Sequence, residues 1–360
     1  MRYLKLAAIL AIAVAASSAS LSARLVPAAM APSLTSVGPI QFGPDGVMFA
    51  ADPSAATIYA LDLGVQASST AAGTAAVASL DQKIAAALGT APAEIRITDL
   101  AVHPKSKNSF IAVMRGQGAA AQPAFVRVDG AGKVDVVSLE TVKFTSVALP
   151  NPANVSTTGR GGRTQSVTDM AFMDGRLVVA GLSNEEFASK LWAVAYPFAK
   201  ADQGTSVEIY HGNHGAVETR SPVMTFVPYK AGTENVIVAA YTCTPLVKFP
   251  VNSFKPGVKV VGHTMMDLGA GNQPIDMVAY TKGGQGYLLM ANSRYGIVKV
   301  PTAQFATAPA ITAKINTAGT WEPIAAWTGV VQLDQLDATN AVYITRAADG
   351  VTNLATGILP

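Results

Sequence analysis

Short apolar runs alternate with turns along most of the chain, and this pattern predicts an all-β protein. The clearest unit begins at Val37, turns at residues 43–46 (Gly-Pro-Asp-Gly), continues in an apolar run over 47–51 and ends in an alternating run over 57–62. Alternation of apolar and polar positions is typical of a strand that buries one face. The unit therefore predicts three consecutive antiparallel strands.

The same unit recurs five more times, each time as an apolar strand followed closely by a second one. The recurrences are 98–102 with 109–114, 168–172 with 176–180, 222–226 with 235–240, 275–279 with 287–291, and 329–333 with 341–344. A spacing of about 50 to 70 residues matches the four-stranded blade of a β-propeller. We expect a single propeller domain over residues 20–360, with six four-stranded antiparallel blades; seven blades are the alternative.

The last unit is one strand short, because only residues 351–359 follow its second strand. A propeller closes when the two ends of the chain share one blade, which removes two exposed sheet edges. We therefore expect the N-terminal segment Leu25–Leu34 to supply the missing strand.

Two insertions interrupt the rhythm of the units. In the first, residues 67–94, Leu80, Ile84 and Leu88 lie at helical spacing and Gly89 is placed as a stop, which predicts a short helix. The second, residues 142–165, has turn residues without periodicity and predicts a mobile loop.

The first residues have the composition of a signal peptide. Arg2 and Lys5 precede an apolar run over 6–16, and small residues follow at 17–19. The run is shorter than the ~20 apolar residues of a membrane helix, and no later stretch approaches that length. We expect residues 1–19 to be cleaved and the mature protein to be periplasmic or secreted, with no membrane insertion.

Composition narrows the class of partner. Half of the residues are hydrophobic and 14% are charged, which suits a large buried core. Without Arg2 and Lys5 the formal net charge falls from +3 to +1, so no nucleic-acid partner is expected. Cys243 is the single cysteine, which excludes an internal disulfide and leaves either an inert buried thiol or a reactive one.

In a propeller, the connections between blades emerge on one face, around the mouth of the central channel. Imidazole and carboxylate groups there suit zinc or a related divalent ion, and a guanidinium binds a carboxylate or phosphate through two parallel hydrogen bonds. The alternative is a polar loop that only turns the chain. We take six residues as candidate ligand-binding groups at this mouth: His211, His214, Glu218, Arg220, Asn272 and Arg294.

Asp99, Asp169 and Asp276 occupy equivalent positions at the start of the innermost strand in three units. Three carboxylates around one channel are candidate ligands for calcium, which takes oxygen ligands. The alternative is that each carboxylate caps a local turn or accepts a backbone N–H from the neighbouring blade.

Cys243 follows an apolar strand and lies on the same predicted face as His211 and His214. If these side chains meet across the cavity, the thiolate and imidazoles would form a metal site, or a nucleophile with its base. A buried and inert thiol is the alternative.

Two stretches resemble blades of the six-bladed NHL-repeat and gluconolactonase-like propellers. They are 42–52 (Phe-Gly-Pro-Asp-Gly-Val-Met-Phe-Ala-Ala-Asp) and 98–104 (Thr-Asp-Leu-Ala-Val-His-Pro), and the likeness extends across most of the mature chain. The resemblance implies a six-bladed propeller. In the lactonase family a Glu opens the first inner strand and helps to bind the catalytic divalent metal, whereas this chain has Val37 before Gly38-Pro39.

Three functions are compatible with this sequence. The first is an exported, non-catalytic propeller that binds a small molecule or a protein partner at the channel mouth. The second is a metal-dependent hydrolase of a lactone or ester, with calcium or zinc as the ion and Asp276 or His214 moving protons. The third is a metal-handling or redox protein that uses Cys243 with the histidines. The residues imply no cofactor beyond such an ion.

Overall fold

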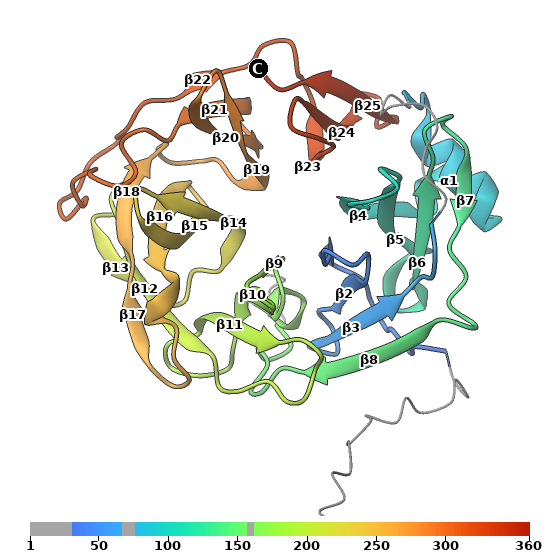
Figure 1. Cartoon of the computed structure of the whole chain (residues 1–360), viewed down its shortest axis with the longest axis horizontal. Coiled ribbons are helices and arrows are strands. Elements are labelled where there is room, and N and C mark those ends of the chain that lie inside the picture. The colour runs from blue at the N-terminus through green and yellow to red at the C-terminus, as the bar shows by residue number, and fades with distance from the viewer. Residues whose placement is uncertain (1–30, 67–75, 157–161) are drawn as a thin grey trace, which may run out of the picture.

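The strands predicted from the repeat form six blades around a central channel (Figure 1). The computed structural model describes residues 31–66, 76–156 and 162–360. The predicted signal peptide lies outside these ranges. The first strand of each blade faces the channel, and successive strands lie progressively further out.

We number the blades by the order of their first strands. Blade 1 consists of β1 (Ile40–Phe42), β2 (Met48–Asp52), β3 (Thr57–Asp62) and β8 (Lys143–Ala148). Blade 2 consists of β4 (Ile95–Val102), β5 (Ser109–Arg115), β6 (Gln122–Val128) and β7 (Val134–Val136). Blade 3 consists of β9 (Asp169–Met173), β10 (Arg176–Leu182), β11 (Ser189–Ala195) and β12 (Thr205–His211), onto which β13 (Ala216–Glu218) folds back as a hairpin.

The remaining blades follow in chain order. Blade 4 consists of β14 (Val223–Ala231), β15 (Glu234–Tyr241), β16 (Pro245–Pro250) and β18 (His263–Asp267), while β17 (Lys259–Val261) pairs in parallel with β12 of blade 3. Blade 5 consists of β19 (Pro274–Lys282), β20 (Gln285–Asn292), β21 (Gly296–Pro301) and β22 (Glu322–Pro323). Blade 6 consists of β23 (Val330–Gln335), β24 (Asn340–Arg346) and β25 (Thr352–Ile358).

The order of blades around the ring differs from their order along the chain, because blade 2 is inserted between the third and fourth strands of blade 1. β3 pairs with β8, with Thr57 opposite Ala148 and Asp62 opposite Lys143. Blade 1 therefore lies between blade 2 and blade 3, and blade 6 meets blade 2. The prediction of a mobile loop over 142–165 was wrong for β8. As an outer strand, β8 buries one residue only, so it shows no hydrophobic alternation.

The ring closes through a segment that we did not predict. The free edge of β25 is covered by Val77, since Val77 and Leu354 exchange two backbone hydrogen bonds of 2.9 Å. Residues 25–30 of the expected closing segment fall outside the described ranges. Ser33, in its described part, contacts blade 1, where its carbonyl accepts the Tyr59 hydroxyl at 3.1 Å. The helix that follows Val77 packs against both blade 6 and blade 2, which holds Val77 beside β25.

That helix, α1 (Leu80–Leu88), confirms the prediction for the first insertion. Leu80 and Ile84 are fully buried beside Leu354, and Gly89 ends the helix with a left-handed φ of 64°. Short 3₁₀ turns span Pro92–Glu94, Gly118–Ala120, Arg163–Gln165 and Val251–Ser253. In the described ranges, every helix is too short or too polar to span a bilayer.

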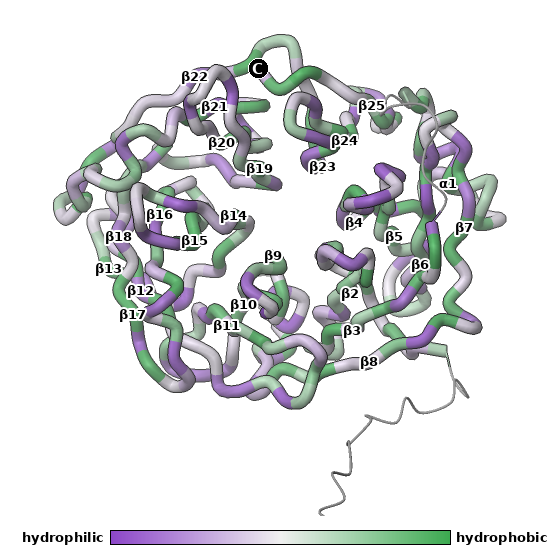
Figure 2. Tube along the Cα trace, in the orientation of Figure 1, coloured by the Kyte–Doolittle hydropathy of each residue, from purple (hydrophilic) through white to green (hydrophobic). Residues whose placement is uncertain are grey.

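The hydrophobic core lies between neighbouring blades, and apolar positions occur in all six (Figure 2). Between blades 1 and 3, Phe49 and Ile58 pack with Leu177 and Trp192, all at most 1% exposed. Because each blade buries its faces against its neighbours, the channel itself is left for polar side chains.

Candidate metal centre at His211, His214 and Cys243

The two histidines lie on a tight hairpin at the outer edge of blade 3. His211 ends β12, and its carbonyl accepts the N–H of Gly215 at 2.8 Å. Gly215 has a φ of 66°, a conformation that suits glycine, and lets the chain return as β13. As a result the His211 and His214 rings lie nearly face to face, with centroids 3.8 Å apart and planes inclined by 31°.

Glu218 holds both imidazoles from one side. Its Oε1 lies 3.0 Å from Nδ1 of His211 and 2.6 Å from Nδ1 of His214, and its other oxygen accepts the Ser221 hydroxyl. Burial alone would raise the pKa of Glu218, but hydrogen bonds from His211, Ser221 and His214 outweigh it and lower that pKa to about 2. The carboxylate therefore stays charged and fixes the orientation of both rings.

The other ring nitrogen of His211 is left without a partner. The side chain is 2% exposed, and Nε2 has no hydrogen-bond partner among the described residues. His214 is 46% exposed. With each Nδ1 occupied by Glu218, the Nε2 atoms are the nitrogens that remain for a ligand.

Cys243 comes from the neighbouring blade, in the turn between β15 and β16. Cys243 and Thr244 both have left-handed φ values, 62° and 45°, which are strained for residues other than glycine. Asn272 supports the turn: its carbonyl accepts the Cys243 N–H at 2.8 Å, and its side chain bonds to Thr244 and, at 2.8 Å, to Asn292. A buried polar network thus keeps the thiol in place.

One ring nitrogen of His211, one of His214 and the Sγ of Cys243 lie within 4.8 Å of one another. The sequence analysis named this proximity as the condition for a metal site, and the structure brings the three side chains together. Imidazole and thiolate together suit zinc or copper, whereas calcium takes oxygen ligands. We call these three residues the His-His-Cys centre.

The centre lies on the rim of the propeller and not at the channel mouth, where we expected it. β12 and β13 lie on the periphery in Figure 1. The mouth holds a different cavity, of about 540 Å³, and no candidate ligand-binding residue lines it. The prediction placed His211 on the correct face of the propeller. His211 lies far from the channel because β12 is the fourth strand of blade 3, counted outward from the channel. Residues lining the mouth include Arg96, Thr98, Met114, Thr168 and Met224.

A segment from blade 5 crosses blade 4 and secures the histidine hairpin. We call it the strap, residues 302–321, between β21 and β22. The N–H of Ile315 donates to the Gly212 carbonyl at 3.0 Å, and the Asn213 side chain donates to the carbonyl of Asn316 at 3.2 Å. Asp267, which is fully buried, accepts the Asn213 N–H at 2.9 Å. No pattern in the sequence pointed to this contact.

The remaining candidate ligand-binding residues have separate surroundings. Asn272 lies under the Cys243 turn and supports it. Arg294 donates to the Ala270 carbonyl at 2.8 Å and lies over the Tyr295 ring. Arg220 is exposed. The structure therefore brings Asn272 to the centre, but shows no contact of Arg294 or Arg220 with its donors.

The channel carboxylates tie neighbouring blades together. Asp99 Oδ2 accepts the N–H of Ile40 at 2.6 Å. The same contact links Asp169 to Phe226 at 2.7 Å and Asp276 to Leu333 at 2.8 Å. Our second interpretation of these residues, that each accepts a backbone N–H from the neighbouring blade, is confirmed. A calcium site at this ring stays a prediction.

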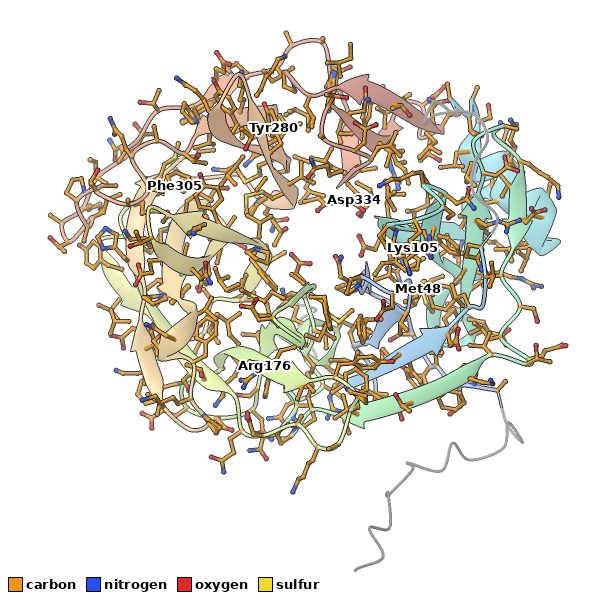
Figure 3. The ribbon with its side chains drawn as sticks, in the orientation of Figure 1. Met48, Lys105, Arg176, Tyr280, Phe305 and Asp334 are labelled. Atoms are coloured by element: carbon orange, nitrogen blue, oxygen red, sulfur yellow. The ribbon has the colours of Figure 1, made fainter. Side chains whose placement is uncertain are left out.

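A fourth carboxylate belongs to the ring and was missed. Asp334 Oδ2 accepts the N–H of Val102 at 2.6 Å, and Asp334 lies beside the channel in Figure 3. In the register of the inner strands, Gln332 occupies the position of Asp99, and Asp334 lies two residues later. The comparison of equivalent positions in the sequence therefore missed it. All four carboxylates line one cavity of about 250 Å³. Burial raises the pKa of Asp169 to about 7 and that of Asp334 to about 6, and raises those of Asp99 and Asp276 well above the usual range.

Comparison with known proteins finds similar solved structures but no family. No family model and no curated protein matches the chain. It is similar to a putative oxidoreductase (glucose dehydrogenase) from Thermus thermophilus, with 12% identity, a TM-score of 0.36, and coverage of 91% of this chain and 98% of that chain. It is also similar to a putative gluconolactonase, with 8% identity, a TM-score of 0.31, and coverage of 93% and 94%. The assignment as a six-bladed propeller, as the blade-level resemblance implied, rests on the sheet topology.

Proposed function

We propose that this chain is a metal-binding β-propeller that holds zinc or copper at the His-His-Cys centre. The observation that supports this proposal most strongly is Nε2 of His211, which is buried and has no hydrogen-bond partner among the described residues. Burying such a nitrogen without a partner costs about 1–3 kcal/mol. A bound metal ion removes that cost, because the nitrogen then has a ligand bond.

The position of Glu218 also supports a metal. Metal-binding histidines generally donate their second ring N–H to a carboxylate or carbonyl, which fixes the tautomer and makes the other nitrogen a better ligand. Glu218 provides this contact to His211 and His214 at once. One charged carboxylate thus prepares two imidazoles for the same ion.

The proposal also gives the single cysteine, Cys243, a role as a metal ligand. We propose that residues 1–19 direct export, as their composition predicts, so that the mature protein folds in an oxidising compartment. A free thiol there is prone to oxidation or to intermolecular disulfides. A metal bound by Cys243 would protect it. Cell fractionation and the mass of the mature N-terminus test the export step.

Elemental mass spectrometry of protein purified without chelator tests the metal proposal. We expect about one equivalent of zinc or copper, lost in His211→Ala and Cys243→Ser. The matched control is His103→Gln, because His103 lies between β4 and β5 of blade 2, where its Nδ1 accepts the Ser106 N–H at 2.9 Å. An empty wild-type protein that also fails to bind added zinc or copper would overturn the proposal.

A second candidate function is binding of a small molecule or a protein segment at the channel mouth, without catalysis. The cavity of about 540 Å³ there favours it, with the exposed Arg96 among its lining residues. Cavities of this size accommodate drug-sized ligands. A thermal-shift screen of small anions and sugars tests it: Arg96→Ala should abolish a positive shift, while the exposed Arg346→Ala should not. If no compound shifts the melting temperature of the wild-type protein, a small-molecule ligand of these classes is ruled out. A shift that Arg96→Ala retains places the ligand elsewhere.

A further inference from the structure

We infer that the His-His-Cys centre is a copper site that takes up and releases one electron, cycling between Cu(II) and Cu(I). This inference rests on the proposed function, because it names the ion and the reaction at the same centre. It is carried by the donor set, by the fixed framework around the donors and by the exposure of one imidazole.

The donor set favours copper over a structural zinc ion. Two imidazoles and one thiolate in a trigonal arrangement are typical of copper centres that transfer electrons, and Cu(II) binds such nitrogen and sulfur ligands more tightly than zinc does. Structural zinc sites are instead closed by four protein ligands. In the described part of the chain, the converging donors are the three of this centre.

Hydrogen bonds fix the residues that carry the donors. Glu218 fixes both imidazoles, the Asn272 carbonyl fixes the Cys243 N–H, and the strap fixes the hairpin through Ile315. Ligands that are held in this way move little when the charge of the ion changes. A small rearrangement between the two oxidation states favours rapid electron transfer.

The exposed imidazole provides the route for the electron. His214 is 46% exposed, whereas the side chain of His211 is 2% exposed. An electron from an external one-electron donor therefore enters at the His214 edge and reduces Cu(II) to Cu(I). The donor is oxidised by one electron, and the bonds from the ion to the thiolate and both imidazoles are retained.

Titration of chelator-treated full-length protein with Cu(II) tests the inference. We expect one equivalent to bind and to produce an intense thiolate-to-copper absorption band in the visible range. Ascorbate should bleach the band and ferricyanide should restore it, over repeated cycles. Electron paramagnetic resonance should show one Cu(II) species in the coloured form alone.

The possible failures are distinguishable. Binding of zinc without a coloured, reversibly reducible copper form would overturn the copper inference and leave the proposed function intact. Binding of neither ion would overturn both. Loss of the thiol through a disulfide-linked dimer on addition of Cu(II) would also overturn the inference, because Cys243 would then be a reductant and not a ligand.

Variants and alkylation show whether Cys243 binds the copper ion or only supports the fold. Cys243→Ser should eliminate the visible band, and His103→Gln should retain it. If Cys243→Ser does not fold, alkylation of Cys243 in the folded metal-free protein should eliminate the band equally. Glu218→Gln, at a positioning residue, should retain the band but weaken copper binding by about 10- to 100-fold. A band that survives alkylation would overturn the inference.

Discussion

The carboxylate of Asp169 accepts the backbone N–H of Phe226 at 2.7 Å and so ties blade 3 to blade 4 inside the channel. Three more carboxylates make the same kind of contact around one small cavity, which places four acids in a poorly solvated space. These links between blades make the stability of the ring depend on pH.

We predict that the free energy of unfolding falls as the pH rises from about 4.5 to 7. Burial raises the pKa of Asp169 from 3.8 to about 7 and that of Asp334 to about 6, so the folded state binds protons more tightly than the unfolded chain in this window. Urea denaturation at several pH values measures the effect. Asp169→Asn should flatten the slope, and a stability that rises across the window would contradict the prediction.

Below this window we predict the opposite dependence. The pKa of Glu218 is lowered to about 2, so the stability that its charged form contributes is lost as the pH falls from about 4.5 towards 2. The same denaturation series, extended to acid and repeated with Glu218→Gln, checks this. Equal acid sensitivity of the variant and the wild type would count against a role for Glu218.

Closure of the ring predicts a strong effect of a single backbone change. Val77→Pro removes the N–H that donates to the Leu354 carbonyl and leaves that buried carbonyl unpaired, so we expect a loss of about 1–3 kcal/mol. Val65→Pro is the matched control, because Val65 is fully exposed. Denaturant titration measures both, and equal stabilities would show that this contact does not close the ring.

The buried ion pair of blade 3 predicts an asymmetry between its two partners. Lys190 is 1% exposed and lies 2.7 Å from Glu185, which is 34% exposed. Glu185→Ala leaves the buried ammonium with the Gln203 carbonyl, at 3.3 Å, in place of a carboxylate, whereas Lys190→Met leaves a carboxylate that water still reaches. The first change should therefore cost more than the second. Glu208→Ala, at the more exposed pair with Lys259, should cost below about 1 kcal/mol. Chemical denaturation ranks the three, and the reverse order would contradict the argument.

Metal binding predicts a gain in stability that depends on concentration. A ligand that binds only the folded state at about 100 times its Kd adds about 2.7 kcal/mol to the free energy of unfolding. We expect this gain with zinc or copper, its removal by EDTA, and its absence in Cys243→Ser. A melting temperature unaffected by either ion or by EDTA would argue against a site that is linked to folding.

Several features followed from local patterns alone. The repeated apolar runs predicted the inner strands of all six blades, and Leu80, Ile84 and Leu88 with Gly89 predicted α1. The positions of His211 and Cys243 at strand ends predicted that they share one face. These predictions were correct because each depends on residues close together in the chain, where strand or helix periodicity is visible.

Other features depended on contacts between distant segments. The insertion of blade 2 into blade 1, the pairing of Val77 with Leu354 and the strap over Gly212 all join parts of the chain whose local sequence carries no sign of the partner. The radial place of the His-His-Cys centre is of the same kind. Local sequence was therefore sufficient for the inner strands and for α1. It was not sufficient for an outer strand such as β8 or for the neighbours of any strand, because packing and register between blades are properties of surfaces that form when the ring closes.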